Sequence, residues 1–170
     1  MDSVFSTALV AAGPNSQYAS ELATFGRLIG SWTMDHDMLS ESSAEWIHLR
    51  QRWTFEWILG GRGIQDVIEP IEADGSLGEP VGTTVRSFDP SIQGWRVNWF
   101  SPKYEEYRSL IAMPYRDGIR QDGSRADGRP IRWNFTEITE NSFVFDGWCS
   151  DDDGETFWHE QHMTATRTPS

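Results

Sequence analysis

The stretch from Glu45 to Gly61, EWIHLRQRWTFEWILGG, decides the fold. Apolar side chains occupy every second position through much of it, which is the period of a β-strand with one buried face. The apolar face carries Ile47, Leu49, Trp53, Phe55, Trp57 and Leu59. Gly60-Gly61 then predicts a hairpin turn into a second strand at 63–71. The sequence therefore begins its sheet with a long antiparallel hairpin.

Short apolar or alternating segments, separated by turn residues, recur through the rest of the chain. The strands that we predict are 32–38, 45–59, 63–71, 82–88, 95–100, 107–113, 118–121, 131–138, 142–150 and 156–167. Their spacing is that of consecutive hairpins, and no long linker divides them. This pattern predicts an all-β protein, an antiparallel up-and-down barrel of about nine or ten strands.

One segment, 16–30, has a strong helical period, because four apolar residues between Leu22 and Ile29 recur at helical spacing. Ser20 is its expected N-cap and Gly30 its expected stop. We interpret residues 1–15 as a mobile N-terminal arm, since they lack the basic residues that open a signal peptide. Residues 16–170 then form a single barrel domain.

The charge balance excludes several classes of partner. Lys and Arg number 14 against 26 Asp and Glu, which gives a formal net charge of −12. Such a chain repels nucleic-acid phosphates and anionic membrane surfaces. Cys149 is the only cysteine, so an internal disulfide and a thiolate zinc site are excluded. These features predict a cytoplasmic protein with no nucleic-acid or membrane partner.

Four groups of residues, taken in order, resemble the lipocalin-like, or calycin, barrels, and in particular a group of bacterial lipocalin-like domains. They are Gly30-Ser31-Trp32 after a short helix, 53–62 with Gln65-Asp66, 82–89 with 94–100, and 153–158 with Ala165-Thr166-Arg167. The resemblance covers about residues 30–167. It implies a cavity, open at one end of the barrel, that takes small hydrophobic or aromatic ligands, with chemistry in a minority of members.

Polar residues on consecutive strands are the first candidates for chemistry. Asp66, Arg86 and Asn98 can form one interior cluster, in which Arg86 holds a carboxylate or enolate oxygen. Asp66 or Glu56 then exchanges a proton with the ligand. The alternative is an Arg–Asp pair on the outer face or at the rim, because alternation allows either face to point outward.

The chain has four histidines, and two of them are site candidates. His162 is a further acid or base, and His36 a ligand-binding residue. His159 and His162 are three residues apart, so in a regular strand they point to opposite faces and cannot share one metal ion. We therefore predict no metal site. Haem held by one histidine, with Met38 and Met163 beside it, is a separate alternative.

The abundant aromatic residues complete the predicted site, with Trp53, Trp57, Trp99 and Trp158 as ligand-binding walls. The function that we predict is binding of a small hydrophobic or aromatic molecule inside the barrel, with cofactor-free acid/base chemistry such as isomerisation, cyclisation or elimination. An isomerase, cyclase or lyase needs a proton donor or acceptor in the cavity, whereas a non-catalytic small-molecule or haem carrier does not. A protein-interaction module or a homodimer requires an uncovered aromatic patch.

Overall fold

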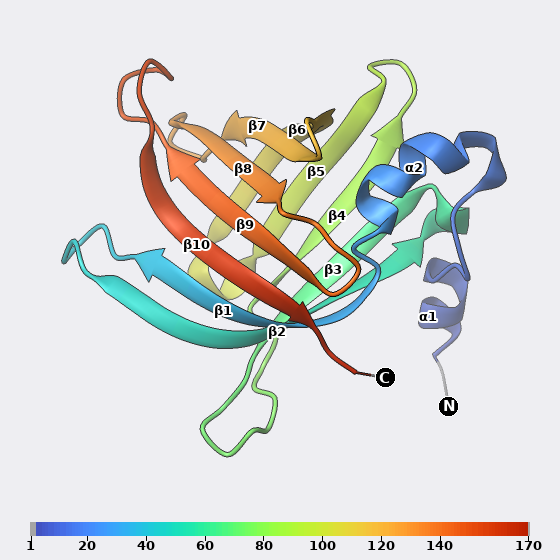
Figure 1. Cartoon of the computed structure of the whole chain (residues 1–170), viewed down its shortest axis with the longest axis horizontal. Coiled ribbons are helices and arrows are strands. Elements are labelled where there is room, and N and C mark those ends of the chain that lie inside the picture. The colour runs from blue at the N-terminus through green and yellow to red at the C-terminus, as the bar shows by residue number, and fades with distance from the viewer. Residues whose placement is uncertain (1–2, 170) are drawn as a thin grey trace.

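The computed structural model describes residues 3–169. Its ten strands each pair antiparallel with their neighbours, and β10 pairs with β1, so the sheet closes into a barrel (Figure 1). The strands are β1 (Gly30–Leu39), β2 (Trp46–Ile58), β3 (Gly63–Pro70), β4 (Gly82–Asp89), β5 (Gly94–Ser101), β6 (Glu106–Tyr115), β7 (Gly118–Ser124), β8 (Pro130–Thr136), β9 (Ser142–Cys149) and β10 (Trp158–Arg167). The predicted all-β, up-and-down barrel with a short N-terminal helix is confirmed.

The helices are short and lie mostly before the barrel. They are α1 (Val4–Leu9), η1 (Ser16–Tyr18), α2 (Ala19–Gly26), η2 (Leu59–Gly61) and η3 (Pro102–Tyr104). The helix that was predicted at 16–30 starts as the 3₁₀ turn η1, where the Asn15 side chain, and not Ser20, accepts the Gln17 N–H. It ends at Gly26, because the chain must turn before Gly30, at φ 116°, starts β1.

The N-terminal segment contacts the barrel at two backbone hydrogen bonds. The N–H of Ala11 donates to Trp57 O at 2.8 Å, and the N–H of Asn15 donates to Gly61 O at 3.0 Å. Helix α1 precedes these contacts and was not expected from the sequence. The mobility of residues 1–15 and the single-domain boundary stay predictions, and residues 1 and 2 lie outside the described part of the chain.

Helix α2 covers one end of the barrel (Figure 1). Phe25 of α2 packs edge-on against Trp95, at 4.9 Å between ring centres, and against Phe135 at 6.0 Å. A Cβ on Gly26 would come within 2.9 Å of the Trp57 ring, so glycine allows the helix to approach closely. This end is closed by a tightly packed aromatic core.

Trp32 of β1 contacts the end of β10, the strand that pairs with β1 to close the barrel. Its ring is fully buried, and its indole N–H donates to Leu28 O at 2.8 Å. The Arg167 guanidinium, from the end of β10, lies 4.0 Å from the Trp32 ring centre, a cation–π contact. Together these contacts fix the start of β1 against the end of β10.

Five loops surround the opposite end of the barrel, at 40–45, 71–81, 102–105, 125–129 and 150–157. Ion pairs tie three of these loops together: Arg125 binds Glu41, and Arg129 binds Glu41 at 3.2 Å and Asp151 at 3.1 Å. The hydrogen bond from Arg125 lowers the pKa of the Glu41 carboxyl. Within residues 3–169, no helix has the length and apolar character needed to cross a bilayer.

Candidate functional site

A cavity of about 420 Å³ lies inside the barrel, between the aromatic core and the loops of the open end. Its apolar lining is Met38, Ile47, Leu49, Trp53, Ile68, Val81, Trp99, Tyr104, Trp133, Phe145 and Met163. Its polar lining is His36, Gln51, Thr84, Arg86, Glu106 and Gln161. A mainly apolar, concave site with a few polar groups is the usual form of a small-molecule pocket.

Asp66 and Arg86 form an ion pair in the interior of the barrel. Their side chains are 0% and 2% exposed, and Arg86 Nη1 donates to Asp66 Oδ2. The backbone N–H of Thr84 donates to the other carboxylate oxygen at 2.9 Å. The alternative that the pair lies outside is wrong, because the β3–β4 register pairs Arg86 with buried Ile64.

Arg86 is also enclosed by aromatic rings. Its guanidinium carbon lies 5.2, 5.4 and 5.9 Å from the ring centres of Phe25, Phe55 and Phe135. Its Nε atom is buried and has no hydrogen-bond partner among residues 3–169. The ring faces and Asp66 hold the guanidinium in place at the wall of the cavity. Asp66 itself does not line the cavity, so it positions Arg86.

His36 is the titratable imidazole of the cavity. Its Nδ1 lies 3.0 Å from Gln51 Oε1, and both side chains are buried. An amide oxygen only accepts, so the proton is on Nδ1 and Nε2 carries a lone pair. Burial lowers the pKa of His36, which keeps the ring neutral. Nε2 has no hydrogen-bond partner within the described chain, and Gln161 lies beside the ring.

Asn98 and Glu56, two of the predicted catalytic or ligand-binding residues, lie on the outer face of the barrel, as does His162, described below. The β4–β5 register pairs Arg86 with Val97, so Asn98 points outward, where its side-chain oxygen accepts from Ser109 at 3.1 Å. Glu56 lies between the buried Phe55 and Trp57 and is exposed. Strand alternation therefore excludes both from the cavity, and their expected roles there were wrong.

The four tryptophans that were expected as walls divide between two places. Trp53 and Trp99 line the cavity. Trp57 is buried beneath Gly26 of α2, at the closed end. Trp158 lies at the rim, with the Arg125 guanidinium 5.7 Å from its ring centre. Trp57 and Trp158 do not line the cavity, because they sit at opposite ends of the barrel.

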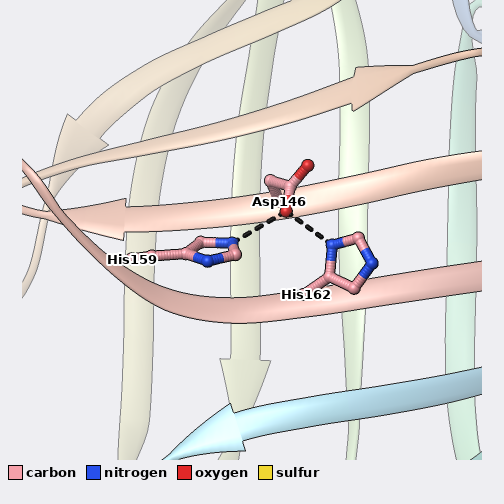
Figure 2. A group of neighbouring side chains, drawn as sticks. All are labelled: Asp146, His159 and His162. Carbon is pink, nitrogen blue, oxygen red and sulfur yellow. Dashed lines mark hydrogen bonds and ion pairs between the residues drawn. The ribbon is translucent and has the colours of Figure 1, made fainter.

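His162 also lies outside the cavity, and it faces the same way as His159 (Figure 2). Nε2 of His159 is 2.8 Å and Nδ1 of His162 is 2.7 Å from the same Asp146 oxygen. The prediction that these histidines face opposite sides was wrong. The β9–β10 register shifts between His159 and Gln161, because a β-bulge adds one residue to β10 and reverses the alternation.

Sequence analysis missed seven polar or aromatic residues of the cavity, namely Gln51, Thr84, Tyr104, Glu106, Trp133, Phe145 and Gln161. Gln51 falls on the same face of its strand as Trp53, so alternation alone identifies it. Glu106 was missed because the predicted strand started at residue 107, one residue after the observed start of β6. It accepts a hydrogen bond from the Trp99 indole at 3.4 Å. Trp133 shares a face of its strand with the apolar Ile131 and Phe135, so alternation identifies it too, whereas Gln161 lies at the β-bulge of β10, where alternation fails.

Five large apolar or aromatic side chains are exposed on the outside of β5 and β6. Phe100 and Tyr107 are separated from Ile111, Met113 and Tyr115 by the hydrogen-bonded pair Asn98–Ser109. Phe100 and Tyr107 are cross-strand partners whose ring centres are 6.5 Å apart. The interaction-module alternative, which requires an uncovered aromatic patch, stays a prediction. The homodimer stays a prediction.

Two solved structures have a fold similar to that of this protein. No family model and no curated protein sequence matches the chain. An S-type phycobiliprotein lyase, CPES, from Guillardia theta has a TM-score of 0.60, with 12% identity, over 92% of this chain and 99% of that chain. Rv2717c from M. tuberculosis also has a TM-score of 0.60 and 12% identity, over 88% of this chain and 98% of that one.

Both neighbours are lipocalin-like barrels, so the lipocalin-like fold that was predicted is confirmed. At 12% identity the likeness extends to the fold alone. Membership of the narrower bacterial group stays a prediction.

Proposed function

We propose that this protein binds a small hydrophobic or aromatic molecule inside the barrel. The observation that carries the proposal is the cavity of about 420 Å³, in which a mainly apolar lining surrounds a few polar atoms. Three polar atoms of the lining residues, His36 Nε2, Trp53 Nε1 and Arg86 Nε, are buried and have no hydrogen-bond partner among the described residues. Buried polar atoms are normally paired, so a ligand whose polar groups reach these atoms after small side-chain rotations gains by entering.

The polarity of these atoms restricts the ligand. His36 Nε2 accepts a hydrogen bond, so a ligand hydroxyl or N–H fits there, whereas Trp53 and Arg86 donate to a carbonyl or ether oxygen. The charge of Arg86 is balanced by Asp66, and Glu106 adds a carboxylate to the lining. The site therefore favours a neutral ligand over the carboxylate that was expected to bind Arg86.

Cofactor-free proton transfer on the bound molecule is the finer part of the proposal. His36 is the candidate base, because its neutral ring lines the cavity and its buried Nε2 has no hydrogen-bond partner among the described residues. Asp66 is unsuited to this role, since both of its oxygens already accept hydrogen bonds. Isomerisation, cyclisation and elimination each require one such proton acceptor near the ligand.

A haem carrier is the second candidate function, and His36 is the observation that favours it. A buried imidazole with Nδ1 held by Gln51 and Nε2 free has the arrangement of a proximal haem ligand, and Met38 and Met163 line the same cavity. Haem would supply an iron centre to the site. We place a smaller organic molecule first, because about 420 Å³ is in the lower part of the usual 300–1,000 Å³ range.

One residue, Cys149, bears on the location of the protein in the cell. Cys149 is the only cysteine and a buried free thiol, and a chain without an internal disulfide suits a reducing compartment. A cytoplasmic location stays a prediction.

Native mass spectrometry and absorbance of the purified protein test the proposal. A co-purified organic molecule supports it, and a Soret band favours the haem alternative instead. Protein that carries nothing is then titrated with the neutral fluorophore N-phenyl-1-naphthylamine. Absence of saturable binding by this probe, together with absence of any co-purified molecule, contradicts the proposal.

A further inference from the structure

The outer face of β9 and β10 carries a compact cluster of donor atoms that the cavity does not use. The bulge in β10 turns His159 and His162 to the same side, where both contact Asp146 of β9 (Figure 2). One ligand atom from each residue lies within 4.8 Å of the other two. Two of the three distances are 2.8 and 2.7 Å, from Asp146 Oδ1 to His159 Nε2 and His162 Nδ1.

The side chains of the cluster are held in place but remain accessible. The His159 ring stacks on Trp148, with 5.5 Å between centres and 28° between planes. The His159 and His162 side chains are 39% and 38% exposed, and that of Asp146 is 17% exposed. An ion can therefore reach the donors from solvent without any movement of the barrel.

The surroundings favour a cation. Asp37 of β1 lies directly opposite His162 in the β1–β10 register, and its carboxylate binds His48 of β2 at 2.8 Å. The formal net charge of the chain is −12. Acidic groups beside the cluster raise the local concentration of cations and oppose the binding of anions.

Two imidazoles and one carboxylate are the ligands of many zinc and other transition-metal sites. Bonds of about 2.0–2.1 Å to a tetrahedral ion place the ligand atoms about 3.3 Å apart. The two distances from Asp146 Oδ1, 2.8 and 2.7 Å, are shorter than this spacing, and all three ligand atoms lie within 4.8 Å of one another, so the side chains need to shift by about 1 Å. The ion needs the lone pair of the ligating nitrogen, so the proton that this nitrogen now donates to Asp146 moves, by exchange with solvent, to the other nitrogen of the same neutral ring.

We propose that Asp146, His159 and His162 bind one divalent transition-metal ion, with Zn²⁺ as the preferred ion. The ion bridges β9 and β10 at the bulge and keeps a position open for water, because the protein supplies three ligands. This site is on the outside of the barrel and is independent of the proposed ligand cavity.

The experiment uses the full chain, stripped of metal with EDTA and dialysed. Zn²⁺ is titrated in competition with a chromogenic zinc chelator, and the thermal midpoint is measured with and without Zn²⁺. We expect one equivalent of Zn²⁺ to bind and to raise the midpoint. His162→Gln and Asp146→Asn each weaken binding by about tenfold or more. His48→Gln, an exposed histidine outside the cluster, is the matched control and leaves binding unchanged.

Two results overturn the assignment: wild-type protein that binds no more Zn²⁺ than His162→Gln, or loss of binding in His48→Gln instead. Circular dichroism checks that each variant is folded. If a variant fails this check, the wild type is titrated with Zn²⁺ and followed by NMR of the imidazole signals. Shifts of His159 and His162 with His48 unmoved support the site, and shifts of His48 alone contradict it.

Discussion

Gln51 Oε1 lies 3.0 Å from Nδ1 of His36, with both side chains buried on neighbouring strands of the barrel. This hydrogen bond fixes the proton on one ring nitrogen and leaves the other with a lone pair that can accept a hydrogen bond. The orientation of the one titratable imidazole that lines the described cavity therefore depends on Gln51. The first prediction concerns that dependence.

Gln51→Leu leaves the Nδ1–H of His36 buried without an acceptor. We expect the free energy of unfolding to fall by about 1–3 kcal/mol, the cost of an unsatisfied buried polar group. Gln65→Leu is the control, because Gln65 is only half-buried and donates to Thr83 on the outer face. Urea denaturation measures both variants. Equal, small changes in the two would show that the His36–Gln51 bond contributes little.

Asp66→Asn leaves the Arg86 guanidinium buried without its counter-charge. We expect a loss of about 3–5 kcal/mol, because an unpaired interior charge is strongly destabilising. The double variant Asp66→Leu/Arg86→Met removes both charges and regains much of the stability. Chemical denaturation compares the variants. A single variant as stable as the wild type would contradict the interior placement of the pair.

The stability of the protein depends on pH through His36. Burial holds its pKa below the ordinary value, so on acidification the unfolded chain binds a proton before the folded chain does. Its contribution is complete above about pH 6.5 and declines as the pH falls toward the lowered pKa. His36→Gln removes this part of the pH dependence, and His48→Gln serves as the control. Urea unfolding at several pH values measures it, and an unchanged slope in His36→Gln would refute the assignment.

We predict that the cavity binds a neutral ligand more tightly than an anionic ligand of similar shape. N-phenyl-1-naphthylamine is neutral, whereas 8-anilinonaphthalene-1-sulfonate has a similar aromatic body and a negative charge. We expect the neutral probe to bind more tightly, because Asp66 neutralises Arg86 and Glu106 repels anions. Fluorescence titration of both probes gives the comparison. Tighter binding of the sulfonate would mean that Arg86 acts as a free cation.

The sequence predicts the barrel well because its signals are local. Strand alternation and the turn residues between strands place ten strands close to their observed bounds. His36 could be assigned to the interior for the same reason, since Trp32, Met34 and His36 share one face of β1 and the first two are apolar.

The candidate site was only partly predictable. Arg86 and Asn98 lie on strands where both faces carry large side chains, so only the observed register shows that Arg86 points inward and Asn98 outward. The β-bulge near Glu160 interrupts a run of polar residues, His159 to His162, in which no apolar period marks the change of face. Alternation fails at this position because the extra residue has no signature of its own.

The most direct test of the central claim fills the cavity. Leu49 lines it, and Leu59 is exposed at the closed end, so Leu49→Trp and Leu59→Trp make the same change inside and outside. Both variants and the wild type are titrated with N-phenyl-1-naphthylamine after circular dichroism confirms their fold. A ligand site inside the barrel predicts that Leu49→Trp loses saturable binding while Leu59→Trp retains it. Equal binding by the two variants would contradict the claim that the ligand is held in the cavity.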